Sequence, residues 1–125
     1  MLLLFLIAFL SLPFHSAASA VDLPPLNGTI NDLAGMMPEP SYQDLEKRIK
    51  LFKGRSGHSI VVITLPSLQG EDLEKFGEKA FYSLPLAEAD LKKTILLIIA
   101  RKEHAVGLRT GEELKELFQI PVQQL

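Results

Sequence analysis

Two hydroxyl side chains stand near the end of an apolar stretch, where an enzyme built on a sheet would place a nucleophile. Thr64 closes the β-branched run at residues 60–64, and Ser67 follows three residues later. Open α/β sheets bind ligands at the carboxyl ends of their strands, so both hydroxyls have a favourable position. A hydroxyl nucleophile also needs an adjacent base, and the sequence places none beside them. Alone, they are weak evidence for a hydrolase.

The other reactive side chains form no complete catalytic pattern. His58 and His104 each begin an expected strand, and neither has a second histidine at metal-ligand spacing. The absence of cysteine excludes a disulfide framework, thiolate catalysis and sulfur-ligated zinc. No Gly-x-Gly-x-x-Gly motif or phosphate-binding loop occurs, so nucleotide binding is not indicated. The formal net charge of -2 and the lack of a basic run with aromatics argue against nucleic-acid binding.

Asp32 is the best single candidate for a functional carboxylate. It lies in residues 21–37, where prolines, glycines and an Asn-Gly pair predict turns and extended chain. Such a segment can border the ligand edge of a sheet. An aspartate in this setting equally suits an Asx turn or a cap for local backbone N–H groups. The sequence favours neither interpretation.

The elements that must position these residues are strands and helices in alternation. Residues 57–65 and 94–100 are apolar runs rich in β-branched side chains, which predicts strands buried on both faces. A helical pattern at residues 71–84 separates them, so we expect a right-handed βαβ unit with parallel strands. Residues 38–57 predict an earlier helix, residues 104–109 an antiparallel strand, and Gly111 the start of a short helix. The chain is thus expected to be one α/β domain with a small, largely parallel sheet and helices on both faces.

The N-terminus is typical of a secretory leader. Residues 1–12 are almost purely aliphatic, and Ala18-Ser19-Ala20 has the small-x-small pattern that signal peptidase cleaves. We expect a signal peptide at residues 1–20, cleavage after Ala20, and a domain at residues 21–125. The leader has no Lys or Arg, which leaves an uncleaved anchor as the alternative, although the apolar run is short for a span. The expected location is periplasmic, secreted or lumenal.

Several of these segments, in this order and spacing, closely resemble the TPM domain family. They are the stretch from Pro24 to Gly35, the Pro-rich and Glu-rich helix start, and the runs at residues 57–68 and 95–100. The family includes thylakoid-lumen and photosystem-repair proteins, bacterial secreted or membrane-anchored proteins and a receptor accessory protein. The resemblance implies a Rossmann-like α/β sandwich outside the cytoplasm. Family domains usually continue through further helical residues, so this chain is expected to be a C-terminally truncated member.

The resemblance also suggests a metal site, because some members are described as calcium-binding or as acid phosphatases. The family's early acidic motif is matched by Ile30-Asn31-Asp32, and its late Gly and Glu by Gly111 and Glu113. The middle Asp-Asn-Gly motif is replaced by Lys92-Lys93-Thr94, with Asp90 two residues upstream as a substitute. Asp32, Asp90 and Glu113 are therefore the candidate calcium ligands. Lysines at the middle position weaken this transfer, since calcium gains affinity from carboxylates.

Glu113 has an alternative structural role. Thr110-Gly111-Glu112-Glu113 has the spacing of a capping box, with Thr110 as the N-cap.

Two functions follow from these observations. The first is a non-enzymatic interaction module that binds a protein at or near a membrane and assists assembly or maintenance of a complex. The second is a calcium-assisted acid phosphatase that uses the three carboxylates. The lysines at residues 92 and 93 favour the first. Neither a substrate nor a particular partner is indicated.

Overall fold

The structure is a computed structural model and describes residues 21–117. The predicted leader and its cleavage site at Ala20 lie outside these residues. None of the helices within residues 21–117 combines the length and apolar character needed to cross a bilayer.

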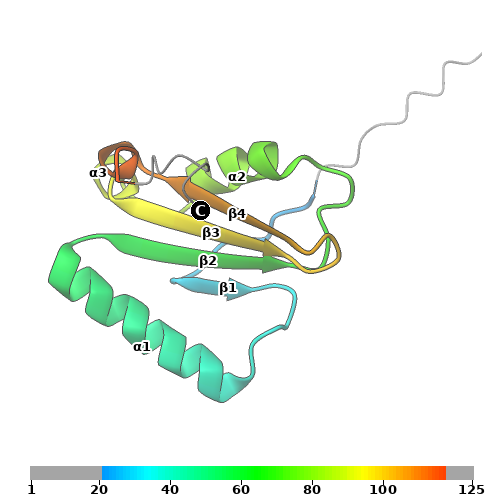
Figure 1. The fold of residues 1–125 in the computed structure, drawn as a ribbon, viewed down its shortest axis with the longest axis horizontal. Helices are drawn as coiled ribbons and strands as arrows, with labels where there is room; N and C mark the ends of the chain where they lie inside the picture. Colours follow the sequence, from blue (N-terminus) through cyan, green and yellow to red (C-terminus); the bar gives the residue numbers. More distant parts are fainter. Residues whose placement is uncertain (1–20, 118–125) are drawn as a thin grey trace, which may run out of the picture.

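Four strands form one open sheet in the order β1-β2-β3-β4 (Figure 1). They are β1 (Ile30–Asp32), β2 (Ser59–Leu65), β3 (Thr94–Ala100) and β4 (Ala105–Thr110). The first three are parallel, and β4 returns antiparallel to β3. The predicted α/β class with a small, largely parallel sheet is confirmed.

Helices lie on both faces of the sheet. Helix α1 (Glu39–Ser56) lies along β1 and β2 on one face, and α2 (Leu73–Tyr82) lies along β3 and β4 on the other (Figure 1). A single turn, α3 (Glu88–Leu91), leads into β3, and a 3-10 turn, η1 (Glu112–Leu114), follows β4.

Local chemistry explains where the two long helices begin and end. Helix α1 ends at Gly57, whose φ of 77° is left-handed and whose N–H donates to Lys53 O. Gly57 and His58 were predicted to open the strand, but this cap delays it to Ser59. Helix α2 starts at Asp72, whose carboxylate accepts a hydrogen bond from Lys75 N.

The core has two parts, one on each face. On the α2 face, β2 and β3 contribute residues such as Val61, Ile63, Leu96 and Ile98 to a large cluster around Phe76. The α1 face holds a smaller cluster.

The α1-face cluster consists of Ile30, Ile49 and Val62, with partly buried neighbours that include Leu97. Burial in β3 therefore alternates, and the prediction that this strand is buried on both faces is only half right. Strand β2 is buried at six of its seven positions, as expected.

Candidate functional site

The carboxyl end of the parallel strands holds Asp32, and its carboxylate is engaged by neighbouring donors. Asp32 Oδ1 accepts hydrogen bonds from Thr64 Oγ1 at 2.5 Å and from Met36 N at 3.0 Å. Asp32 Oδ2 accepts from Met37 N at 2.9 Å. The strand register brings these two side chains together, because Asp32 of β1 pairs with Thr64 of β2. Asp32 therefore does cap local N–H groups, as the structural interpretation predicted.

These contacts also set the protonation of Asp32. Partial burial raises the pKa of its carboxyl, but the hydrogen bonds from Thr64, Met36 and Met37 outweigh it and leave the pKa below its ordinary value. Asp32 is thus ionised at neutral pH and serves as an acceptor for the turn that follows β1.

The two candidate hydroxyls at this end, those of Thr64 and Ser67, also form hydrogen bonds within the protein. Thr64 Oγ1 accepts from Ala34 N at 3.0 Å in addition to its bond to Asp32. Ser67 Oγ donates to Glu103 Oε1 at 2.8 Å, and the same oxygen accepts from Leu68 N. Arg101 Nη1 donates to Ala34 O at 2.9 Å. This polar network joins the loops after β1, β2 and β3, and each described side chain in it has a structural partner.

The other two predicted metal ligands lie at the opposite end of the sheet. Asp90 belongs to α3, just before β3, and Glu113 belongs to η1, just after β4. Thr64 lies five residues beyond Ser59, whose register partner on β3 is Thr94. At about 3.3 Å per residue, the Asp32 end and the Asp90 end are roughly 16 Å apart along the strands. One ion cannot bind Asp32 together with Asp90 and Glu113.

Backbone contacts hold the middle and late family positions against one another. Gly111 N donates to Thr94 O, and Glu113 N donates to Lys92 O. A Cβ on Gly111 would lie 2.1 Å from Leu91 O and 2.4 Å from Lys92 O, so only glycine fits. The match of Gly111 to the family thus has a packing explanation.

The predicted capping box at Thr110 is wrong. Thr110 is the last residue of β4, and Gly111 is the N-cap of η1 with no side-chain cap. The strand extends one residue further than predicted because Thr110 pairs with Ile95. This pairing commits Thr110 to the sheet.

A hollow of about 420 Å³ opens beside this junction, between the end of α2, α3 and β4. Its charged lining comprises three cations and two carboxylates: Lys92, Arg109, Lys115, Glu88 and Glu112. Calcium prefers six to eight oxygen ligands with several carboxylates, and three neighbouring cations oppose it. This donor set does not fit calcium.

An exposed apolar surface lies elsewhere, on the α1 face of β3 and β4. Leu108 pairs with Leu97, and Leu97 pairs with Val62 of the α1-face cluster, so all three side chains share that face. Val106 is 65% exposed and Leu108 is 52% exposed. With three partly buried β3 residues they form the β3–β4 face, which comprises Ile95, Leu97, Ile99, Val106 and Leu108. Helix α1 lies over β1 and β2, and no element within residues 21–117 covers the β3–β4 face (Figure 1).

The sequence did not indicate this surface. A continuous apolar run such as residues 94–100 reads as doubly buried, whether or not a helix covers its second face. The usable signal was the alternation in residues 104–109, where Val106 and Leu108 are the apolar members.

The strand order and the helices on both faces define an α/β domain with an open, largely parallel sheet. A family model of the TPM domain matches residues 30–121, and the chain therefore belongs to the TPM domain family.

Among solved structures, the chain is similar to the N-terminal domain of the cg2496 protein from Corynebacterium glutamicum, determined by solution NMR. The TM-score is 0.57 with 19% sequence identity, over 85% of this chain and 64% of that chain. Similarity at this identity concerns the fold alone. A comparison with curated proteins finds no match.

Proposed function

We propose that this chain is an exported, non-enzymatic TPM domain that binds a protein at or near a membrane and assists assembly or maintenance of a complex there. The observation that supports this most is the β3–β4 face, where five aliphatic side chains lie together and two of them are at least half exposed. Exposed apolar patches of this kind mark interaction sites in soluble proteins.

The dimensions of the β3–β4 face favour an amphipathic helix of the partner as the occupant. Neighbouring strands are about 4.8 Å apart, so two strands offer a width of roughly 10 Å. Packed helices lie about 8–10 Å apart, which is the same width. Helix α1 occupies the β1–β2 half of the layer. One further helix, packed beside α1, would cover the β3–β4 half of this face, as in sheets that have helices over the whole of both faces.

The metal-assisted phosphatase hypothesis has less support within residues 21–117. Its three predicted ligands are divided between two ends of the sheet, and the hollow at one of these ends is lined by more cations than carboxylates. The direct test is calcium titration and phosphatase assay on the processed chain.

The partner proposal is tested by site-specific photocrosslinking in the cells that produce the protein. A photoreactive residue at Leu108 should crosslink to a membrane-associated protein, and peptide mapping should place the link on a segment with apolar residues every three to four positions. The matched control is Leu51, a leucine of α1 with 50% exposure, where the same residue should give no such product.

A second experiment measures whether the contact matters. Leu108→Glu should abolish recovery of the crosslinked partner with the domain, whereas Leu51→Glu should leave it intact. Crosslinks from position 108 to residues 118–125 of the same chain, or to a second copy, would contradict the proposal, because the face would then be covered without a partner.

A further inference from the structure

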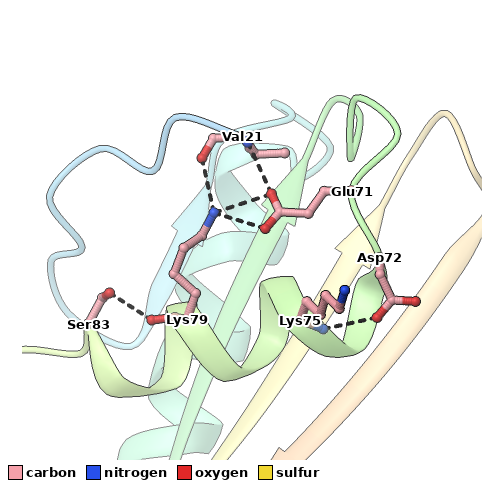
Figure 2. A network of polar contacts seen from close by, with 6 residues as sticks. All are labelled: Val21, Glu71, Asp72, Lys75, Lys79 and Ser83. Atoms are coloured by element: carbon pink, nitrogen blue, oxygen red, sulfur yellow. Dashed lines mark hydrogen bonds and ion pairs between the residues drawn. The ribbon is translucent and has the colours of Figure 1, made fainter. Parts of the chain in front are cut away.

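Val21 is held in place through both its side chain and its backbone. Its side chain is 7% exposed and belongs to the cluster on the α2 face. Its N–H donates to Glu71 Oε2 at 3.0 Å, and Lys79 Nζ lies 3.4 Å from its carbonyl oxygen. Lys79 Nζ also binds both carboxylate oxygens of Glu71, at 3.0 and 3.2 Å (Figure 2). The backbone nitrogen of Val21 thus points at a carboxylate.

Val21 is also the residue that follows the predicted cleavage site. Signal peptidase hydrolyses the bond after a small-x-small sequence, which here is the bond between Ala20 and Val21. Water supplies the oxygen of the new Ala20 carboxylate, the C–N bond breaks, and the Val21 nitrogen takes up protons to become an α-ammonium.

We propose that export processing after Ala20 creates an N-terminal ammonium at Val21 that pairs with Glu71, so that cleavage itself fastens the N-terminal segment to the start of α2. Before cleavage the nitrogen is a neutral amide with one donor. After cleavage it carries a positive charge and three donors, and a charge-assisted hydrogen bond is stronger than a neutral one. The inference rests on the predicted cleavage and is independent of the proposed partner.

The surroundings of Glu71 suit this role. Its side chain is 17% exposed, and the pKa of its carboxyl is raised by burial but lowered more by the hydrogen bonds from Val21 N and Lys79, so that it remains ionised. Lys79 is the competing cation, and its repulsion of the new ammonium limits the gain. Asp22, the next residue in the chain, is an exposed carboxylate.

The pairing of the Val21 ammonium with Glu71 makes the stability of the folded domain depend on pH in a definite direction. An α-amino group has an ordinary pKa of about 7.7 to 8.0. A partner for its charged form raises that pKa in the folded state. The added stability is therefore complete below about pH 7.7 and is lost as the pH rises through the folded value.

The test uses the exported, processed protein and the same material after selective acetylation of the α-amine near pH 6.5, where lysines remain protonated. Mass spectrometry should first show that the exported chain begins at Val21. At pH 6.5 the free amine should then favour the folded state about fivefold over the acetylated form, which corresponds to an α-amine pKa raised by about 0.7.

A thermodynamic cycle assigns the effect to Glu71. In Glu71→Gln the difference between free and acetylated chains should disappear, whereas Glu74→Gln, a nearby exposed glutamate in the first turn of α2, should retain it. If Glu71→Gln does not fold, the α-amine pKa of the unaltered protein still decides. A chain that begins at another residue, an α-amine pKa at its ordinary value, or equal stability of free and acetylated protein would each overturn the proposal.

Discussion

Removal of the Asp32 carboxylate should destabilise the domain strongly even if the protein has no chemistry at that position. The carboxylate accepts hydrogen bonds from Thr64 Oγ1, Met36 N and Met37 N, at 2.5, 3.0 and 2.9 Å. Thr64 is fully buried, and its oxygen also accepts from the N–H of buried Ala34. One side chain thus organises the turn that connects β1 to α1.

The size of the destabilisation depends on which of the three donors can bind water once the Asp32 carboxylate is removed. Met36 N is exposed and loses little when Asp32 is replaced by alanine. The hydroxyl of Thr64 and the partly buried Met37 N lose a charged acceptor, and such bonds contribute about 1.5 to 3 kcal/mol each in favourable settings. Some relaxation of the turn reduces the total. We expect Asp32→Ala to lower the free energy of unfolding by about 2 to 4 kcal/mol.

Urea denaturation followed by circular dichroism at pH 7 measures this directly. A double-mutant cycle of Asp32→Asn with Thr64→Val should give a coupling of about 1 to 2 kcal/mol, because the two side chains share a hydrogen bond. The pH dependence has a fixed sign. Since the pKa of Asp32 is lowered on folding, its stabilisation is present above the unfolded pKa of about 3.9 and is lost as the pH falls through the folded value.

Asp44→Asn is the matched control, because Asp44 is an exposed aspartate of α1 whose ion-pair partner within residues 21–117 is Arg48. It should change the free energy of unfolding by less than about 0.5 kcal/mol. An Asp32→Ala change as small as this control, together with lost calcium or phosphate-ester chemistry, would refute the structural role and support the metal-site reading.

Three further outcomes test other parts of the structure. Val62→Ala should cost about 2 kcal/mol in a denaturant titration and Leu97→Ala clearly less, since Val62 is 3% exposed beneath α1 whereas Leu97 belongs to the β3–β4 face; equal losses would mean that this face is covered. Gly111→Ala should lower the melting temperature by more than about 10 °C, because its Cβ would meet carbonyl oxygens at 2.1 and 2.4 Å. In calorimetric titration, Lys92→Asp with Lys93→Asn should strengthen calcium binding over the unaltered domain, and tight binding by the unaltered domain would contradict the argument that these lysines oppose calcium.

The two long helices and the two long strands were predictable from the sequence because their signals are local. Apolar residues repeat at helical spacing in α1 and α2, and β-branched runs mark β2 and β3. Strand β1 was not predicted. It has only three residues within a turn-rich segment, and it exists because Ile30 and Asn31 pair with the middle of β2.

The site residues were less predictable because their contacts are distant in sequence. Asp32 meets Thr64 across 32 residues, and Arg101 reaches Ala34 across 67. The sequence identified Asp32 and Thr64 separately, each as a candidate for chemistry, but only the register shows that they satisfy each other. The separation of Asp32 from Asp90 likewise depends on β1, the unpredicted strand that places Asp32 at the carboxyl end of the sheet.

The distribution of satisfied polar groups shows where this domain can engage other molecules. Parallel sheets usually bind ligands at the carboxyl ends of their strands, where loop residues are free to reach outward. Here the side chains at that edge join the loops to one another: Asp32 and Thr64 hold the turn after β1, and Glu103 holds Ser67. A ligand at this edge would compete with those bonds for the same carboxylate oxygens and hydroxyls.

The opposite edge of the sheet and the β3–β4 face differ from the Asp32 edge, where side-chain hydrogen bonds join the loops. The charged hollow near Lys92 is open and rich in cations, and the β3–β4 face presents aliphatic side chains that have lost only part of their contact with water. Covering Val106 and Leu108 would gain about 25 cal/mol for each Å² of apolar surface removed from water. The gain requires no hydrogen bond to be broken within the domain, which makes association through the β3–β4 face energetically simpler than ligand binding at the Asp32 edge.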